Sequence, residues 1–291
     1  MATIPVPEKR GRGRPSKEDQ ARREQLALMR LQETDETDDQ RVTRIAERFS
    51  VMHLMLRAMI RGQLPSLIIS GAAGIGKTHT ATQLLDSAKD SGQINYGAFS
   101  AGTITPPELY RLFYTYRHAN DIILLDDSDN VYDNDGNLSL LKAATDGTRK
   151  SRRLSHLADN QSFAADNIPN TFEYHGSLCV ITNRDMQRMI DLGTNKDVPH
   201  MKAIMSRATY LDTALHTPRD LMAWINHMVM KQHILVQNDC THAQEQDVMR
   251  WVNAHFADMR ELSLRTVVRL ARTMVMDPQN WELIARVTLL R

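Results

Sequence analysis

Residues 71–78 read GAAGIGKT, which matches the G-x-x-x-x-G-K-[ST] spacing of a phosphate-binding loop, or P-loop. The apolar run LIIS at 67–70 precedes the loop and predicts a buried strand, and a helical pattern follows from Lys77 to Lys89. The motif binds phosphate when it follows a strand and opens a helix, and this sequence has that order. A glycine loop that matched the motif by chance would lack this context. The stretch therefore predicts a nucleotide-binding α/β fold.

The residue types in the loop suit the triphosphate of ATP and its Mg²⁺ ion. Glycines let backbone N–H groups turn inward around phosphates, and the N-terminus of the following helix adds partial positive charge. We expect Lys77 to reach the β and γ phosphates and Thr78 to give its hydroxyl to Mg²⁺. The predicted nucleotide-binding residues are Gly71, Ala72, Ala73, Gly74, Ile75, Gly76, Lys77, Thr78 and His79. His79 also fits an ordinary position on a helix face.

A second apolar strand ends in two acidic residues, because residues 122–127 read IILLDD. In open α/β sheets ligands bind at the carboxyl ends of the strands, and this strand delivers Asp126 to such an end. We expect Asp126 to hold Mg²⁺ through water, and Asp127 to act as the catalytic base or to position the attacking water. The alternative interpretation is a pair of solvated aspartates at a strand end.

Short apolar runs alternate with helical segments up to residue 215, which predicts a parallel sheet with helices on both faces. The other predicted strands are 94–99, 178–182 and 208–212, and the other predicted helices of this part are 41–60, 106–118 and 138–145. Four further helices are predicted near 217–232, 242–257, 264–276 and 279–289. The predicted organisation is a tail at 1–40, a P-loop domain at 41–215 and a small all-helical domain at 216–291.

Together these motifs resemble the AAA+ ATPases, which combine a P-loop, a strand ending in two acids, a later strand ending in Thr-Asn, a Ser-Arg pair and a helical lid. The resemblance covers residues 41–291 and implies an ATP-hydrolysing P-loop domain with a parallel five-stranded sheet flanked by helices, followed by the lid. The acid after the magnesium aspartate is usually Glu in that family. Here it is Asp127, as in helicase-loader and initiator relatives, and this shorter acid allows slow turnover.

The resemblance implies a polar sensor at the end of the strand in VITNRD, residues 180–185. Asn183 takes the position that hydrogen-bonds the γ-phosphate or the attacking water, and Thr182 is the less favoured occupant. The alternative is a plain turn after the strand. The spacing from Asp126 favours the sensor.

Two arginines match functional positions of the same family. Arg207, in IMSRATYLD, resembles the arginine of clamp-loader-like ATPases that reaches the γ-phosphate of the neighbouring subunit and stabilises transition-state charge. Arg265, in the first turn of a predicted lid helix, resembles the second sensor arginine, which folds back onto the phosphates. An ordinary surface position is the alternative for Arg207, and Arg184 and Arg188 are weaker candidates for its role.

An arginine that acts in a neighbouring subunit implies a head-to-tail interface, and such interfaces close into rings or continue as filaments. The resemblance therefore implies a homo-oligomer, with a hexamer expected. Two functions remain open: a helicase-loader-like ATPase that acts on DNA or a DNA-bound complex in replication or recombination, and an ATP-driven protein remodeller or assembly factor. A scaffold without ATPase activity is disfavoured because every catalytic position is present.

The N-terminal stretch KRGRGRPSK at 9–17 favours the DNA function. Its core resembles the AT-hook, in which a glycine lets the backbone lie on the floor of a narrow minor groove and the arginines extend along it. The predicted DNA-binding residues are Arg10, Arg12, Gly13, Arg14, Pro15 and Lys17. A generic basic tail is the alternative. The acidic run at 33–39 contains no apolar residue, so the whole tail is predicted to be disordered.

The segment 150–176 is long for a connection and could contain a short strand and a hairpin. Insertions here reach the central pore in AAA+ proteins, so Arg152 and Arg153 are candidates for contact with a DNA backbone, or else belong to an ordinary solvated turn. The run from Pro169 into Gly176 and the sensor strand also resembles small phage-type AAA+ proteins.

Composition limits the remaining classes. The 291 residues carry a net charge of +1, so any DNA site must depend on local charge. Two distant cysteines and eleven histidines show no metal-ligand spacing such as H-E-x-x-H. No apolar run approaches the ~20 residues that span a bilayer, and the N-terminus lacks the apolar segment of a signal peptide. We therefore expect a cytoplasmic protein, in the host cytoplasm if it is viral.

Overall fold

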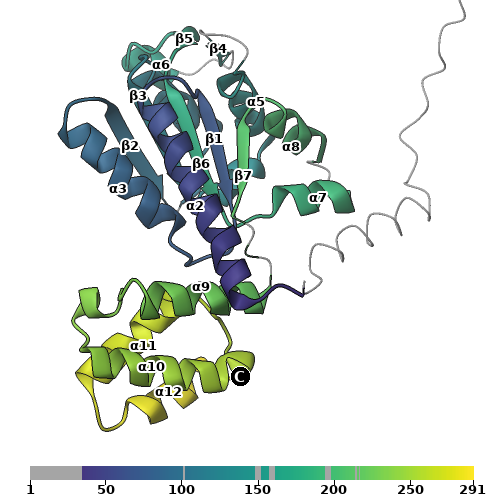
Figure 1. The fold of residues 1–291 in the computed structure, drawn as a ribbon. Helices are drawn as coiled ribbons and strands as arrows, with labels where there is room; N and C mark the ends of the chain where they lie inside the picture. Colours follow the sequence, from purple (N-terminus) through teal and green to yellow (C-terminus); the bar gives the residue numbers. More distant parts are fainter. Residues whose placement is uncertain are drawn as a thin grey trace, which may run out of the picture.

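The computed structural model describes residues 35–100, 102–147, 152–156, 161–193, 198–213, 215 and 217–291. Figure 1 shows a sheet with helices packed along it and, beyond one end of the sheet, a bundle of helices. The predicted DNA-binding residues of the N-terminal stretch lie outside the described part of the chain.

Five parallel strands form the central sheet in the order β2-β3-β6-β1-β7. Their bounds are β1 Ser66–Ser70, β2 Asn95–Ser100, β3 Asp121–Asp126, β6 Ser177–Thr182 and β7 Thr209–Asp212. Ser70 pairs with Thr182, and Asp126 pairs with Ile181, so β1, β6 and β3 end side by side. The loops that follow these three strands therefore meet at one edge of the sheet.

Helices cover both faces of the sheet, which explains why β1, β3 and β6 are buried along their whole length. On one face α2 and α3 pack through Met52, Leu56 and Leu85. On the other face α4, α5 and α8 pack against the sheet. The bounds of these helices and of two short ones are α2 Asp38–Ile60, α3 Lys77–Asp90, α4 Pro106–Thr115, α5 Asp135–Ala144, α6 Gln161–Ala165, α7 Met186–Leu192 and α8 Val198–Met205.

The helical bundle after β7, which we call the lid, has its own apolar core. Its helices are α9 Pro218–Met230, α10 His242–His255, α11 Leu264–Met276 and α12 Trp281–Leu289. The first half of α2 packs against α9, where Phe49 stacks on Trp224 with ring centroids 4.9 Å apart. Arg41 and Asp220 form a buried ion pair of 3.0 Å across the same contact. Helix α2 therefore holds the lid and the sheet together.

Helix α2 begins earlier than the predicted end of the disordered tail. Thr37 caps the helix in a reciprocal capping box with Gln40, and Asp38 lies in the first turn, where acidic side chains favour the positive end of the helix dipole. Glu36 also forms a 2.9 Å ion pair with Arg44. The prediction of disorder was wrong for residues 35–40, because their acidic charge is used at a helix N-terminus.

The segment between α5 and β6 contains an antiparallel hairpin of β4, Arg152–Ser155, and β5, Thr171–Tyr174. Arg152 is buried beneath it. Its guanidinium donates to the carbonyls of Ala144, at 2.8 Å, and Gly176, and it lies 4.7 Å from the Tyr174 ring centroid. The suggested DNA contact is therefore wrong for Arg152, which is a structural residue of the hairpin. Arg153 is exposed, and its role stays a prediction.

A P-loop between β1 and α3, this strand order and a helical lid after the last strand together form the AAA+ fold. None of the helices in the described part of the chain combines the length and apolarity needed to cross a membrane.

Candidate nucleotide-binding site

The P-loop leaves β1 at Ser70 and enters α3 at Lys77 through a backbone that glycine favours. Gly76 caps α3 with a φ of 105°, and Gly74 has a φ of 67°. A Cβ atom at Gly74 would lie 2.8 Å from the Cβ of Ser263 in the lid. Glycine at this position therefore allows both the turn of the loop and the close approach of the lid.

Lys77 reaches back across the loop to its start. Its ammonium donates to the carbonyls of Gly71 and Ala72, both at 2.7 Å, and to Asn183 Oδ1 at 3.1 Å. Burial lowers the pKa of Lys77 to about 8, although nearby carboxylates, with Asp126 the largest, act in the opposite direction. The ammonium is thus held in place by neutral oxygen atoms that a phosphate group could replace.

Thr78 and Asp126 form the expected pair for a hydrated Mg²⁺ ion. The Thr78 hydroxyl donates to Asp126 Oδ1 at 3.1 Å. Burial raises the pKa of Asp126, the Thr78 hydrogen bond lowers it, and the neighbouring Asp127 charge raises it again. A divalent cation bound to Asp126 would stabilise its charged form, which burial and the neighbouring Asp127 charge both disfavour. Hard oxygen donors from a hydroxyl and a carboxylate are those that Mg²⁺ prefers.

Asp127 and Asn183 come from neighbouring strands and meet at the carboxyl edge of the sheet. Asn183 Nδ2 donates to Asp127 Oδ1 at 2.6 Å, while Asn183 Oδ1 accepts from Lys77. Asp127 is exposed and has a φ of 48°, an uncommon value for a residue other than glycine. A continuous hydrogen-bonded line therefore runs from Lys77 through Asn183 to Asp127.

Thr182, the alternative sensor, is fully buried, and its hydroxyl bonds to Asp129 instead of lining the nucleotide cavity. Its hydroxyl donates to Asp129 and accepts from the backbone N–H of Arg184 at 3.0 Å. Arg184 in turn pairs with Asp133 at 2.9 Å. Arg184 is therefore engaged on its own chain. The supporting role of Asp129 was missed at the sequence level, because its partner is more than fifty positions away.

The lid contacts the P-loop directly. The N–H of Leu264 donates to the carbonyl of Gly74 at 2.9 Å, and the indole N–H of Trp224 donates to the carbonyl of Ile75 at 3.2 Å. These bonds place the first turn of α11, with Arg265, beside the P-loop. The positive charge of Arg265 acts to lower the pKa of Lys77, which is consistent with its position near the phosphate site.

A cavity of about 360 Å³ lies between the P-loop, the strand ends and the lid. One wall is polar and contains Lys77, Asp126 and Asn183. The lid contributes an apolar wall with amides at its edge, formed by Met228, Ile234, Gln237, Asn238, Leu264 and Val268. A charged wall opposite an apolar one suits a molecule with a phosphate end and a flat apolar ring. His79 also lines the cavity and is exposed.

A larger hollow of about 770 Å³ lies beside β2 and α4 and includes Phe99, Arg111 and Tyr116. It contains none of the P-loop residues. We therefore assign the nucleotide site to the smaller cavity, which is lined by the P-loop, and not to this larger hollow.

Arg207 lies after α8, in the turn that leads to β7, and is exposed. Its guanidinium donates to the carbonyl of Ala203 at 2.8 Å. It does not line the cavity of its own chain. This position suits a contact with another molecule better than one with the nucleotide of the same chain.

No protein-family model matches the chain. A sequence relative from Enterobacteria phage T4, described as "Uncharacterized 36.7 kDa protein in nrdC-mobD intergenic region", is 34% identical over 257 residues. The match covers 88% of this chain and 78% of the relative.

Two solved structures show more distant similarity. The RuvB Holliday junction branch migration motor of Thermotoga maritima is 15% identical, with a TM-score of 0.44 over 80% of this chain and 61% of that chain. Trip13 of Rhizobiales is 13% identical, with a TM-score of 0.36 over 91% of this chain and 89% of that chain. Similarity at this level adds nothing to the fold assignment, which depends on the strand order and the P-loop.

Proposed function

The chain belongs to the family of the 36.7 kDa phage T4 protein, and we propose, from the site that its own residues form, that it is a Mg²⁺-dependent ATPase acting as an oligomer on DNA. The observation that carries this proposal is the line of hydrogen bonds from Lys77 through Asn183 to Asp127, at 3.1 and 2.6 Å, beside the Thr78–Asp126 pair.

The line gives each residue a separate task. Lys77 exchanges two backbone carbonyls for oxygens of the β and γ phosphates and places its positive charge there. Thr78 and Asp126 hold Mg²⁺ with its waters, and the ion, when bound, neutralises charge that develops on the phosphates. Asp127 orients the attacking water and accepts its proton, while Asn183 holds the Asp127 carboxylate in position.

The lid supplies the fourth side of the site. Its apolar wall is suited to the adenine ring, and Arg265 in the first turn of α11 is suited to contact the phosphates. Because Leu264 and Trp224 donate to P-loop carbonyls, any change in the loop on hydrolysis would be transmitted to the lid.

The exposed position of Arg207 supports a role between subunits. A guanidinium supplied from a neighbouring chain stabilises transition-state charge, by about 10³-fold or more in NTPases that use one. We propose a head-to-tail ring or filament, in which the Arg207 of one subunit completes the site of the next.

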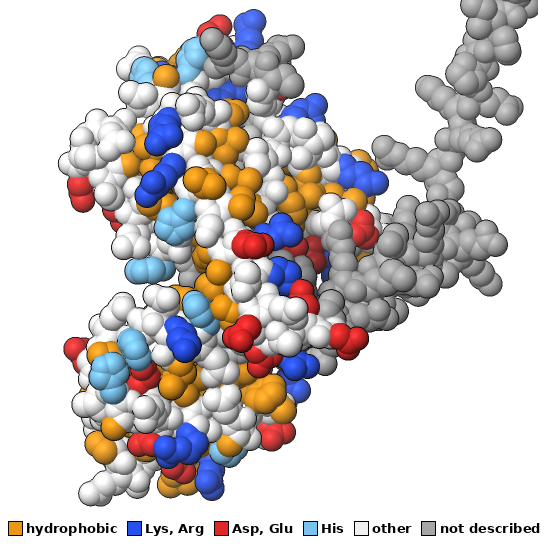
Figure 2. Space-filling view, in the orientation of Figure 1, with side chains coloured by type: hydrophobic (Ala, Val, Ile, Leu, Met, Phe, Trp, Pro, Cys, Tyr) orange, Lys and Arg blue, Asp and Glu red, His pale blue; other side chains and the backbone are white. Residues whose placement is uncertain are grey.

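The DNA function is supported by the sequence Arg12-Gly13-Arg14-Pro15 and its basic neighbours. Figure 2 shows Lys and Arg side chains interspersed with Asp and Glu over one face of the described part. A local DNA contact through the tail fits a chain whose net charge is only +1. Several tails on one ring would gain avidity, about 10²-fold or more where geometry allows.

The ATPase proposal is tested by three variants measured for MgATP binding and phosphate release. Lys77→Ala should lose nucleotide binding, whereas Asp127→Asn should bind normally and release no phosphate. Arg207→Ala should bind normally but hydrolyse poorly, and Arg61→Ala, at another exposed arginine, should match the wild type. Wild-type turnover by Asp127→Asn would show that Asp127 is not the base.

Mixing experiments test whether Arg207 acts in a neighbouring subunit. Arg207→Ala and Asp127→Asn subunits, mixed in equal amounts, can form interfaces that contain one intact site. Part of the activity should then return. The absence of rescue at every mixing ratio would contradict an arginine acting between subunits.

The DNA function is tested by fluorescence anisotropy with AT-rich and GC-rich duplexes. The wild type should prefer the AT-rich duplex, and Arg12→Ala/Arg14→Ala should lose that preference. Each lost phosphate contact should lower the slope of log affinity against log salt by about 0.9. Equal affinity for both duplexes would reduce the hook to a basic tail, and no DNA binding by any form would favour a protein remodeller.

A further inference from the structure

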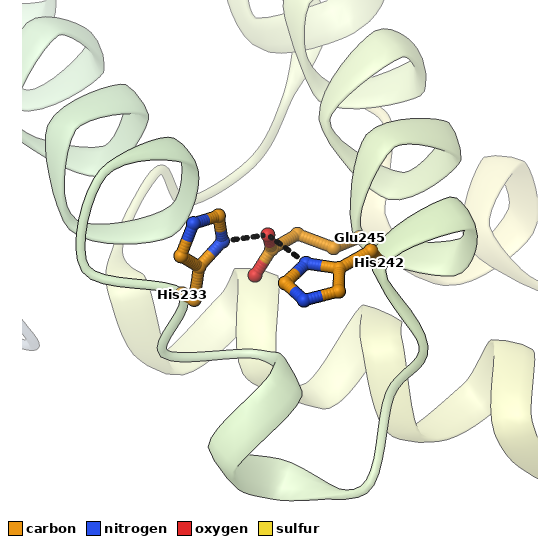
Figure 3. Close-up of side chains that lie close together, drawn as sticks. All are labelled: His233, His242 and Glu245. Atoms are coloured by element: carbon orange, nitrogen blue, oxygen red, sulfur yellow. Dashed lines mark hydrogen bonds and ion pairs between the residues drawn. The ribbon is translucent and has the colours of Figure 1, made fainter.

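His233, His242 and Glu245 come together in the lid, at the junction of α9 and α10. Figure 3 shows the side chain of His233, from the loop after α9, pointing towards His242 and Glu245 on α10. One nitrogen or oxygen atom from each residue lies within 4.8 Å of the other two. The sequence shows no recognisable ligand spacing here, because a loop brings His233 back to the start of α10.

The distances within this cluster are those of a compact set of ligands. Nδ1 of His233 lies 2.7 Å from Glu245 Oε1, and Nδ1 of His242 lies 3.9 Å from the same oxygen. Two ligand atoms in a tetrahedral zinc site are about 3.3 Å apart, given metal–ligand bonds of about 2.0–2.2 Å. The two distances lie on either side of that value, and no pair of ligand atoms in the set is more than 4.8 Å apart, so rotations of the two imidazoles would bring the three atoms to ligand spacing.

Glu245 provides the second, independent reason to expect a cation. Its side chain is only 2% exposed, whereas those of His233 and His242 are 48% and 67% exposed. Its Oε2 atom is buried and has no hydrogen-bond partner among the residues that the structure describes. A buried carboxylate with one unsatisfied oxygen is unfavourable unless a positive charge compensates it.

We propose that His233, His242 and Glu245 bind a divalent transition-metal ion, for which Zn²⁺ is the best match. Two imidazoles and one carboxylate are a donor set that Zn²⁺ accepts, with a water or another group in the fourth position. Mg²⁺ prefers oxygen ligands and is a poor match for two imidazoles. The site is separate from the proposed magnesium position at Thr78 and Asp126.

The location gives such an ion a structural task. The loop between α9 and α10 places Ile234, Gln237 and Asn238 in the wall of the nucleotide cavity. His233 and Asp239 in this loop have φ values of 53° and 70°, which are uncommon for residues other than glycine. A metal joining His233 to α10 would fix this loop and therefore the lid wall of the cavity.

The test measures metal binding in the nucleotide-free full-length chain without a histidine tag. Zn²⁺ is titrated against a chromogenic chelator in millimolar Mg²⁺, which saturates oxygen-rich sites, and Co²⁺ is used as a spectroscopic probe. The wild type should bind one Zn²⁺ per chain, gain thermal stability with Zn²⁺, and show the intense visible absorption of low-coordinate Co²⁺.

Two ligand variants and one control decide the outcome. His242→Ala, at an exposed position, and Glu245→Gln, which keeps the side-chain shape, should each weaken Zn²⁺ binding by about 100-fold or more. His53→Ala, at an exposed histidine on α2, should bind like the wild type. Circular dichroism establishes that each variant is folded.

Three results would overturn the proposal. They are the absence of Zn²⁺ binding by the wild type, binding that both ligand variants retain, and equal loss in the His53→Ala control. The first would mean that the contact between His233 and Glu245 is a hydrogen-bonded pair only. Because the readout is metal binding, these results are independent of whether the chain hydrolyses ATP.

Discussion

The uncharged amine form of Lys77, which is present near pH 8, should take up a proton when nucleotide binds. Burial lowers its pKa from 10.5 to about 8 in the nucleotide-free site. A triphosphate would place several negative charges around it and raise the pKa again. About half of the chains carry an uncharged Lys77 at pH 8, so binding at that pH should take up about half a proton per chain.

The same pKa sets the size of the effect on affinity. With a pKa of about 8, the charged fraction of Lys77 falls from about 0.9 at pH 7 to about 0.1 at pH 9. The affinity for MgATP should therefore fall about tenfold over this range, or about 1.4 kcal/mol. The loss should appear as pH rises, because the protonated form is the one that binds phosphate.

The free energy of unfolding of the nucleotide-free chain should rise with pH, whereas the affinity for MgATP should fall. Between pH 8 and pH 10.5 the unfolded chain holds the Lys77 proton that the folded chain has released. Stability from this group therefore rises with pH across that window, by about 3 kcal/mol. Below pH 8 the full penalty for burying the ammonium is present, and a bound triphosphate should remove it.

The assay is calorimetry of a non-hydrolysable MgATP analogue at pH 8, in two buffers with different enthalpies of ionisation. The difference in heat gives the number of protons taken up. Lys77→Arg is the matched control, because a guanidinium stays charged throughout this range. Wild-type binding without proton uptake, or with the same uptake as Lys77→Arg, would contradict a lowered pKa of Lys77 in the nucleotide-free site.

Three further predictions concern the contacts that hold the site together. Asp220→Asn weakens a buried ion pair between α2 and the lid, so the free energy of unfolding should fall by about 3–5 kcal/mol in urea titrations; a loss below about 1 kcal/mol would contradict that role. Gly74→Ala adds a Cβ atom 2.8 Å from that of Ser263 at a positive φ, and thermal unfolding should show a loss of about 2–5 kcal/mol. An unchanged melting temperature would mean that Ser263 in the lid does not pack closely against the P-loop at Gly74. Thr182→Val removes the hydroxyl that donates to Asp129, which should reduce stability by about 1–3 kcal/mol and slow ATP turnover. Unchanged turnover in a steady-state assay would show that this hydrogen bond does not support the proposed role of Asn183 at the end of β6.

The central sheet was predictable because its signals are local. Each strand is a short apolar run that must be covered on both faces, and each predicted strand overlaps an observed one. The helices were less predictable where they are short. Helices α7 and α8 were missed, since seven or eight residues give little periodicity to detect.

Contacts that join distant parts of the chain were not predictable. Arg152 reads as a basic surface residue, yet it is buried, and the carbonyls of Ala144 in α5 and Gly176 before β6 accept hydrogen bonds from its guanidinium. The start of α2 reads as a solvated acidic run, yet Thr37 and Asp38 form a helix N-terminus there. In both cases the structure that these residues adopt depends on their hydrogen-bond partners, and local composition does not identify those partners.

The P-loop could be recognised from the sequence alone, because its glycines, Lys77 and Thr78 lie within eight consecutive residues. The parallel sheet was also predictable from the sequence, because its buried strands appear as apolar runs of four to six residues. Which polar side chains meet became clear only from the folded arrangement of the strands, helices and loops. The line from Lys77 through Asn183 to Asp127 and the cluster of His233, His242 and Glu245 depend on strand order and loop path. Hydrogen bonds and metal ligands act over about 2–3 Å, and a distance of that size is fixed only when the packed core sets the relative positions of whole elements.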